Sequence, residues 1–167
     1  QFITGFMFVL PLLNQDSTLT ITKPYESKSY VNLTIQMLAK FGIEIIETSS
    51  NSYLIKGNQH YKAQDVSVEG DFSQLAFFAV LGTLNNTLSC SNMDMSSKQG
   101  DKAILDCIPS FTSDKDTITF TKKQPAPQTI DLSNCPDLGP ILCVLASFTN
   151  GETNIVNAAR SEERRVG

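Results

Sequence analysis

The segment LAFFAVLGTL at residues 75–84 has the length of a helix and is apolar on nearly every side of one. A helix at a protein surface carries one polar face, so a helix that is apolar all round requires burial on every side. Two asparagines, Asn85 and Asn86, and a short strand-like stretch, TLSC at 87–90, follow it. This order of helix, polar turn and strand predicts one element of an α/β fold.

The same order occurs three times along the chain. Each copy has an apolar helix, a polar turn and a short strand, and the strands start at Thr18, Thr87 and Thr153, 69 and 66 residues apart. The other two apolar segments are GFMFVLPLL (5–13) and GPILCVLASF (139–148). Such spacing is too long for a solenoid repeat and suits a small α/β unit used several times. We expect the three apolar helices to be among the most buried elements, each flanked by strands.

The segments between these helices add a second helix and more strands. Residues 30–41 have apolar side chains on one face, which predicts an amphipathic helix, and Gly42 ends it. Residues 43–46 (IEII) and 52–55 (SYLI), separated by a turn rich in Ser and Asn, predict a hairpin. In the second copy, a helix over 102–108 and a strand over 117–120 hold the corresponding places.

Composition indicates a folded, soluble protein. The chain has 167 residues, of which 41% are hydrophobic and 18% charged, which is too few charges for a disordered polyelectrolyte. The apolar stretch at residues 2–13 is too short to span a membrane and has no basic residues before it. We therefore expect no membrane association.

Charge and cysteine usage exclude two further classes. The formal net charge is -4 and no run of Lys or Arg is interleaved with aromatic residues, so nucleic acid is not an expected partner. Four scattered cysteines (Cys90, Cys107, Cys135, Cys143) and the single His60 give no metal-ligand spacing. We expect free thiols in the reducing cytoplasm, no metal and no cofactor.

Four segments, read in order, resemble the enolpyruvyl transferase family and specifically its members that act on shikimate 3-phosphate. These segments are QFITGFMFVLPLL from Gln1, ESKSYVNLTIQMLAKFGIEI from Glu26, VEGDFSQLAFF from Val68, and CPDLGPILCVLA from Cys135 with GETNIVNAAR after it. Any one of them alone is a weak signal. Their common order, on a repeat already found in the residues, makes the resemblance specific over residues 1 to about 160.

The resemblance implies a fold and an activity. The fold is the inside-out α/β architecture of two similar domains, each built from three βαβαββ units with helices buried and sheets outside. Residues 1–68 would be the end of the first domain and residues 69–160 the first half of the second. The implied reaction transfers the carboxyvinyl group of phosphoenolpyruvate to the 5-hydroxyl of shikimate 3-phosphate, releasing phosphate, in chorismate and aromatic amino acid biosynthesis.

The resemblance also implies residues that bind the shikimate ligand. Gln1 matches a glutamine that contacts shikimate 3-phosphate, and Ser27 and Tyr30 match the Ser and Tyr of a Ser-Lys-Pro-Tyr segment, although Ser29 replaces the proline. In that segment the Ser hydroxyl binds phosphate and the Tyr lies along the ring. Ser27 alone reads equally as a helix cap, and Lys28 as an ordinary surface lysine. Helix starts near Gln1, Asp71 to Ser73 and Asp137 are also candidate anion sites.

Asp137 is the candidate catalytic residue. It matches the Asp of the family's Pro-Asp helix start, whose carboxylate hydrogen-bonds the attacking hydroxyl and is a candidate general base. Its alternative role is capping of the helix beside Pro136. The VEGD segment at Val68 marks the crossing between domains in the family, and we expect it to be structural.

The resemblance ends after Arg160, which we expect to approach the shikimate ligand. Residues 161–167 (SEERRVG) match nothing expected and suggest a truncated or chimeric reading frame. The family's cationic phosphoenolpyruvate site is absent, so we expect this fragment to be inactive alone and the complete enzyme to be a monomer. Two alternatives are the sister transferase acting on UDP-N-acetylglucosamine, whose cysteine loop is not found, and a non-catalytic α/β binding or scaffold module.

Overall fold

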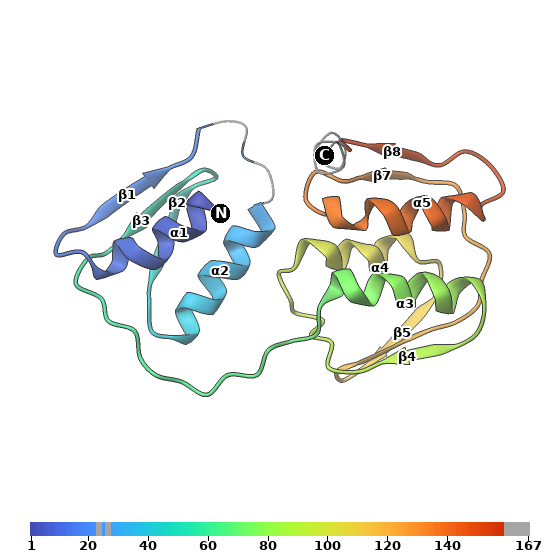
Figure 1. Cartoon of the computed structure of the whole chain (residues 1–167), viewed down its shortest axis with the longest axis horizontal. Helices are drawn as coiled ribbons and strands as arrows, with labels where there is room; N and C mark the ends of the chain where they lie inside the picture. Colours follow the sequence, from blue (N-terminus) through green and yellow to red (C-terminus); the bar gives the residue numbers. More distant parts are fainter. Residues whose placement is uncertain (23–24, 26–27, 159–167) are drawn as a thin grey trace, which may run out of the picture. The chain divides into compact units, whose positions relative to one another are not determined.

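A computed structural model describes residues 1–22, 25 and 28–158 of the chain. The chain divides after Val68 into two compact units, and the second unit begins at Glu69 (Figure 1). That the units are the end of one family domain and the first half of the next stays a prediction.

Unit 1 is a three-stranded antiparallel sheet with two α-helices. The strand order is β1-β3-β2, with Ser17 opposite Ile55 and Ile45 also opposite Ile55. The predicted hairpin is present as β2 and β3, and the predicted amphipathic helix as α2, with Gly42 at φ +81° just after it. The elements are α1 (Phe2–Val9), a 3-10 turn (Leu10–Leu12), β1 (Ser17–Thr20), α2 (Lys28–Lys40), β2 (Ile45–Ser49) and β3 (Ser52–Ile55).

The core of unit 1 lies between one face of this sheet and the helices. Along β3, Tyr53 and Ile55 are buried and alternate with half-buried neighbours, as expected for a strand with one face on a core. The helices contribute Met7 from α1 and Val31 and Leu38 from α2. Only one face of α1, the face that carries Met7, packs into this small core.

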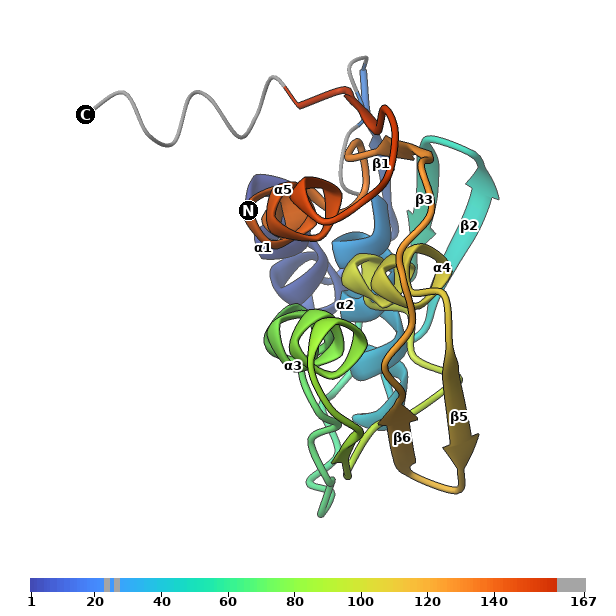
Figure 2. The ribbon, with the colours of Figure 1, turned by 90° about the vertical axis from the view of Figure 1, so that its right-hand side faces the viewer.

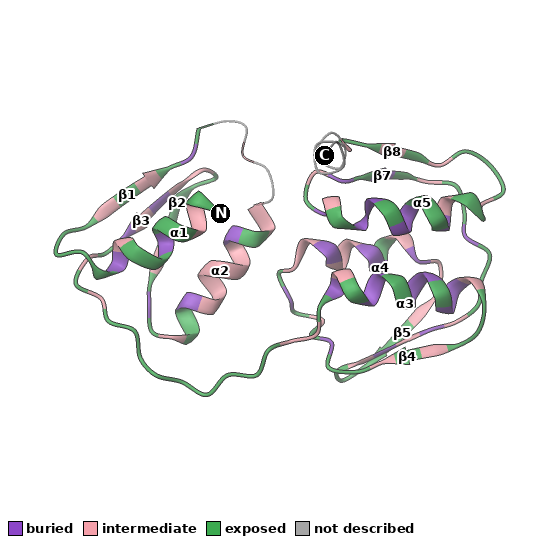
Figure 3. Ribbon diagram, in the orientation of Figure 1, coloured by how far each residue is buried: buried purple, intermediate pink, exposed green. Residues whose placement is uncertain are grey.

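The expectation that α1 is deeply buried is wrong for this chain. Met7 is its one buried residue, while Phe2 is 86% exposed and Phe6, Phe8 and Val9 are also exposed (Figure 3). The physical reason is the number of partners. α1 contacts α2, and residues 1–68 supply no third α-helix among the described residues to cover its other sides.

Unit 2 repeats this arrangement and adds a parallel pair of strands. A second antiparallel sheet has the order β4-β6-β5, with Leu88 opposite Phe120, and β7 pairs with β8 in parallel. The elements are α3 (Phe72–Leu84), β4 (Leu88–Cys90), η2 (Gly100–Ala103), α4 (Ile104–Cys107), β5 (Phe111–Asp114), β6 (Thr117–Phe120), β7 (Thr129–Asp131), η3 (Pro136–Leu138), α5 (Gly139–Ser147) and β8 (Asn154–Val156).

The helices and strands of unit 2 form a continuous core. Figure 2 shows α3 and α5 on one side of the unit and β5 and β6 on the other. Seven residues of α3 are buried, against Ile118 and Phe120 of β6. A Cβ on Gly82 would lie 2.8 Å from Cβ of Phe120, so glycine permits the close approach of α3 to the sheet. In this unit the prediction of buried apolar helices is confirmed for α3 and α5, although each keeps exposed apolar residues.

The internal repeat is confirmed by topology as well as by order. In both units an apolar helix leads to a strand, which pairs with the second strand of a hairpin, with an amphipathic or mixed helix between them. The buried positions correspond too, because β3 and β6 share the same alternating pattern. β7, α5 and β8 form a βαβ unit, which begins a third copy. The mixed α/β class and the repeated unit follow from the sequence.

Candidate functional site

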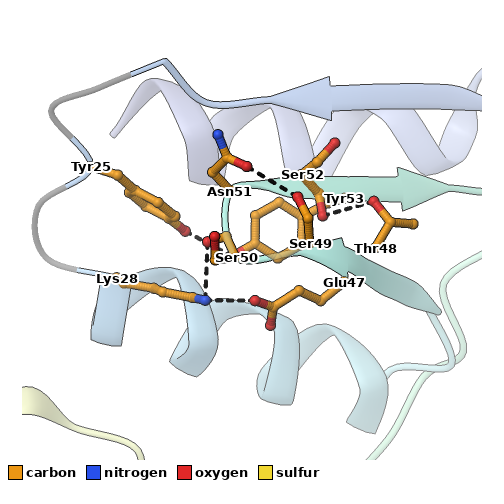
Figure 4. A network of polar contacts seen from close by, with 9 residues as sticks. All are labelled: Tyr25, Lys28, Glu47, Thr48, Ser49, Ser50, Asn51, Ser52 and Tyr53. Atoms are coloured by element: carbon orange, nitrogen blue, oxygen red, sulfur yellow. Dashed lines mark hydrogen bonds and ion pairs between the residues drawn. The ribbon is translucent and has the colours of Figure 1, made fainter.

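The start of α2 is held to the β2–β3 hairpin by Lys28. Its Nζ lies 2.5 Å from Oε1 of Glu47 and donates to the carbonyl oxygen of Ser50 at 3.1 Å (Figure 4). The same ammonium lies 6.0 Å from the centre of the Tyr25 ring. Lys28 thus uses its charge within unit 1.

Tyr25 and Tyr53 form a second contact beside this ion pair. Their hydroxyl oxygens are 2.8 Å apart, and either hydroxyl can donate (Figure 4). Tyr53 is fully buried on β3, and burial first, then the hydrogen bond with Tyr25, raises the pKa of its phenol. Tyr25 therefore connects the approach to α2 with the core of unit 1.

Two of the predicted shikimate-binding residues lie in described parts of unit 1. Gln1 is the N-cap residue of α1, is exposed, and makes no side-chain cap bond, while Tyr30 lies exposed in the first turn of α2. α1 and α2 pack together. Ser27 lies outside the described residues, as does Arg160. The contribution of each of these four residues to ligand binding stays a prediction.

Asp137 lies in the 3-10 turn η3 that leads into α5. The turn begins with Pro136, and its N-cap residue is Cys135, so Asp137 is inside the first turn and is not the cap. The carboxylate is exposed while its neighbours Leu138 and Gly139 are buried, which fixes the backbone beneath it. A carboxylate in this position is stabilised by the helix dipole and accessible to a ligand.

Two backbone N–H groups at the start of α3 already donate to side chains of unit 2. The N–H of Phe72 donates to Oε1 of Gln99 at 2.9 Å, and the N–H of Ser73 donates to Oδ1 of Asp71 at 2.9 Å. These two hydrogen bonds favour the structural reading of Asp71 to Ser73 over an anion site. The structural reading of these residues, with Asp71 as the helix cap, is confirmed.

Asp101 is a buried carboxyl group that sequence reasoning missed. It is buried at the second position of η2, where burial first, then the charge of Asp137, then that of Asp71, raises its pKa to about 6. The sequence shows only Gln99-Gly100-Asp101 before a predicted helix, which is typical of an exposed helix start. Nothing in this pattern indicates burial, because the burial comes from packing of η2 against α3 and η3.

The four cysteines are free, as predicted. Burial raises the pKa of the Cys107 and Cys135 thiols to about 11, so both stay protonated near neutral pH. Across the described part of the chain, no three His, Cys, Asp or Glu side chains are grouped so as to hold a metal ion. Within the same residues, no helix combines the length and apolarity needed to cross a membrane.

A family model described as EPSP synthase (3-phosphoshikimate 1-carboxyvinyltransferase) matches residues 1–165. The chain belongs to the EPSP synthase family. The matched range includes residues 161–165, which had stood outside the resemblance seen in the sequence.

Curated EPSP synthase relatives support the same assignment. The chain is 49% identical over 162 residues to the 3-phosphoshikimate 1-carboxyvinyltransferase of Clostridium acetobutylicum, and 44% identical over 164 residues to that of Clostridium kluyveri. Each comparison covers 96% of this chain and 38% of the relative. The chain thus spans less than two-fifths of the length of these curated EPSP synthases.

Solved structures confirm the fold of this EPSP synthase segment. EPSP synthase from Acinetobacter baumannii matches with a TM-score of 0.75 at 16% identity, covering 96% of this chain and 39% of that one. The enolpyruvyl transferase NikO from Streptomyces tendae matches with a TM-score of 0.71 at 16% identity, covering 92% and 38%. At this identity the likeness concerns the fold alone.

Proposed function

We propose that the complete protein transfers the carboxyvinyl group of phosphoenolpyruvate to the 5-hydroxyl of shikimate 3-phosphate and releases phosphate. The observation that carries the proposal is the family match over residues 1–165, together with 44–49% identity to enzymes named for this transfer. The exposed Asp137 at the start of a buried helix is consistent with it.

In the proposed reaction, Asp137 is the general base. The attacking hydroxyl loses its proton to a carboxylate as its oxygen bonds to C2 of phosphoenolpyruvate, while the methylene carbon C3 takes up a proton from a general acid. Phosphate then leaves from C2 as the new methyl group gives up a proton and the double bond is restored. A base of this kind must lie within hydrogen-bond reach of the hydroxyl, which requires an exposed carboxylate on a rigid support. Asp137 offers both, because Leu138 and Gly139 beside it are buried.

Gln1, Ser27, Tyr30 and Arg160 are proposed to bind the shikimate ligand. For Gln1 and Tyr30 the support is their exposure on α1 and α2, two helices that pack together. For Ser27 and Arg160 the support is the family match over their positions. The proposal includes a cytoplasmic location, consistent with the four free thiols, and a monomeric complete enzyme.

The test uses a graft of this segment. Residues 1–165 replace the matching part of the Clostridium acetobutylicum relative, and phosphate release is followed with both substrates. We expect turnover by the folded graft and none by the 167-residue chain alone, because the chain spans 38% of the length of such relatives. A graft that folds, as judged by circular dichroism, and yet releases no phosphate would contradict the proposed function.

A substitution then tests the base. In the graft, Asp137→Asn should lower turnover by about a hundredfold or more while changing the affinity for shikimate 3-phosphate much less, because a base acts chiefly in the transition state. The matched control is Asp114→Asn, an exposed carboxylate on β5, which should leave turnover unchanged. Full turnover in the Asp137 variant would remove this residue from the mechanism.

A further inference from the structure

A side-chain hydrogen bond joins the ends of the parallel strands β7 and β8 (Figure 1). Nδ2 of Asn157, the residue after β8, donates to Oδ1 of Asp131, the last residue of β7, at 2.9 Å. Both side chains are exposed, so the bond contributes little to the core. Its place has a functional meaning, because ligands of α/β proteins bind outside the carboxyl ends of parallel strands.

Asn157 has an unusual backbone conformation. Its φ of +57° lies in the left-handed region, which is costly for residues with a Cβ atom. Asparagine tolerates this region better than most other residues. Such conformations persist where the surrounding structure holds them, and they are frequent at functional sites. The hydrogen bond to Asp131 is the contact that holds this one.

Asp131 is also the first anchor of the loop between β7 and η3. Its Oδ1 accepts a second hydrogen bond, from the N–H of Ser133 at 2.8 Å, and its carbonyl oxygen accepts from Sγ of Cys135 at 3.4 Å. The N–H of Cys135 donates to the carbonyl oxygen of Leu132 at 3.2 Å, and its own carbonyl oxygen accepts from the N–H of Leu138 at 3.1 Å. A series of hydrogen bonds therefore runs from the end of β7 into η3, the turn that carries the proposed base.

This loop is tied to β8 by two hydrogen bonds. One is the bond from Asn157 to Asp131, and the other joins the N–H of Leu132 to the carbonyl oxygen of Val156 at 3.0 Å. The hydrogen bond from Asn157 first, then those from Ser133, lower the pKa of Asp131. The carboxyl group is therefore ionised near neutral pH, and an ionised acceptor makes the stronger hydrogen bonds.

We propose that Asp131 and Asn157 are positioning residues, whose hydrogen bond holds the loop before η3 in the conformation that presents Asp137. A general base must lie within hydrogen-bond reach of the proton it removes, and a displacement of about 1 Å can lower a rate by up to about a hundredfold. Leu138, which is fully buried, fixes the residue after Asp137, and the anchored loop fixes the residues before it. The inference rests on the proposed function, in which Asp137 accepts the proton of the attacking hydroxyl.

A purely stabilising role explains this hydrogen bond less well. β7 and β8 are already paired through their backbones, with Thr129 opposite Asn154 and Asp131 opposite Val156. Substitutions of exposed residues usually change stability little. What the side-chain bond adds to the backbone pairing is a fixed start for the loop that leads to Asp137.

Three variants separate the hydrogen bond from other effects of substitution. Asn157→Gly removes the donor, and glycine adopts a positive φ without strain, so the backbone conformation is kept. Asp131→Ala removes the acceptor. Asp131→Asn keeps one carbonyl oxygen, which can accept the bonds that Oδ1 accepts from Asn157 and Ser133. The first two variants should therefore lose the positioning effect, and the third should retain it.

The first test does not depend on catalysis. In the ¹⁵N-labelled 167-residue chain, folding is checked by circular dichroism and the order parameter of the Asp137 amide is measured by relaxation. We expect it to fall from about 0.85, typical of rigid backbone, toward about 0.6 in Asn157→Gly and in Asp131→Ala, and to stay high in Asp131→Asn. An Asp137 amide that is as rigid in the first two variants as in the unaltered chain overturns the proposal.

Asn58→Gly is the matched control. Asn58 lies in unit 1, is exposed, has a φ of +54°, and donates from Nδ2 to the carbonyl oxygen of Asn14 at 3.0 Å. The same substitution thus removes the same kind of bond at the same kind of backbone position. It should leave the order parameter of Asp137 unchanged.

The second test measures the reaction in the graft. Asn157→Gly and Asp131→Ala should each lower kcat about tenfold, with KM for shikimate 3-phosphate changed less than about twofold. The double variant should lose no more than either single one, because both remove the same bond. Asp131→Asn should keep at least about half of the turnover, as should Asn58→Gly. A purely structural role would reduce the amount of folded graft and leave kcat per folded molecule unchanged, and that result would overturn the proposal.

The two tests separate failure of this inference from failure of the proposed function. If the unaltered graft shows no turnover, the proposed function fails, and the order parameter of the Asp137 amide still decides whether the bond between Asp131 and Asn157 holds the loop. If the graft is active and depends on Asp137, but Asn157→Gly and Asp131→Ala leave kcat unchanged, the inference alone is wrong.

Discussion

Nε2 of Gln99 donates a hydrogen bond to Oε1 of Glu69 at 2.8 Å, joining residues 30 positions apart in the chain. The same nitrogen donates to the carbonyl oxygen of Gly70 at 3.0 Å, and Oε1 of Gln99 accepts from the N–H of Phe72 at 2.9 Å. Ser97 adds a hydrogen bond from its Oγ to Oε1 of Glu69 at 2.7 Å. The first residues of unit 2 are thus fixed to the loop before η2.

Gln99→Ala should destabilise unit 2 by about 2 to 3 kcal/mol. The substitution removes three side-chain hydrogen bonds, each with a net value of roughly 0.5 to 1.5 kcal/mol, and leaves the N–H of Phe72 without this acceptor. Urea unfolding followed by circular dichroism measures the change. Gln64→Ala, at an exposed position, is the control and should change stability by less than about 0.5 kcal/mol. Equal effects of the two substitutions would contradict the role of Gln99.

Gly57→Ala should destabilise unit 1 by about 1 to 3 kcal/mol. A Cβ at this position would lie 2.4 Å from the carbonyl oxygen of Gln15 and 2.7 Å from that of Leu13, so the backbone would have to move. Gly5→Ala is the matched control in the same unit. It lies within α1 with no atom within 4 Å of its added Cβ, and alanine there should stabilise the helix by about 0.5 to 1 kcal/mol. Thermal unfolding of both variants measures the two changes in stability. If Gly57→Ala and Gly5→Ala change the stability in the same direction, the prediction is wrong.

Tyr53→Phe should cost about 1 kcal/mol at pH 8, because it removes the hydroxyl that pairs with Tyr25. The pKa of Tyr53 is raised in the folded state, so its neutral form gives stability that is complete below pH 10 and is lost as pH rises further. Phenylalanine does not titrate, so the difference between the two proteins should shrink above pH 10. A double-mutant cycle with Tyr25→Phe checks the pairing, and purely additive effects would show that the hydroxyls are uncoupled.

Asp101→Asn should stabilise the chain at pH 7 and have little effect at pH 3.5. The folded pKa of about 6 exceeds the ordinary value of 3.8, so the neutral carboxyl favours folding below pH 3.8, and this contribution is lost as pH rises through 6. The gain at pH 7 should be on the order of 1 to 2 kcal/mol. Screening by water of the exposed Asp71 and Asp137 keeps it below the roughly 3 kcal/mol that the full pKa difference implies. Urea unfolding at both pH values is the measurement, and a gain that does not vary with pH would contradict the assignment.

The sequence predicted the elements of the fold well, because each depends on local pattern. Gly42 ends α2, the residues of β3 alternate between half-buried and buried, and β6 covers the predicted residues 117–120. The exposure of Phe2 and Phe6 could not be predicted in this way. The apolar sequence of a helix predicts that it will be covered on all sides. Its actual burial depends on which other elements of the chain are present to cover it.

The candidate site was only partly predictable. Asp137 and Tyr30 came from a resemblance in short motifs, and the structure places both at the starts of helical elements, exposed. Gln99 and Asp101 were missed because their roles depend on contacts between segments that are far apart in sequence. A Gln-Gly-Asp stretch has the same appearance whether it faces water or, as here, closes over the start of α3.

The shared strand order of the two antiparallel sheets has an evolutionary consequence. Tyr53 and Ile55 of β3 hold the buried positions that Ile118 and Phe120 hold in β6, yet no identical side chain remains at either pair. Topology and the inward positions have outlasted residue identity, as in an old duplication of one ancestral segment. Even a buried position therefore differs between the copies: the phenol of Tyr53 pairs with Tyr25 in unit 1, where unit 2 has the apolar Ile118.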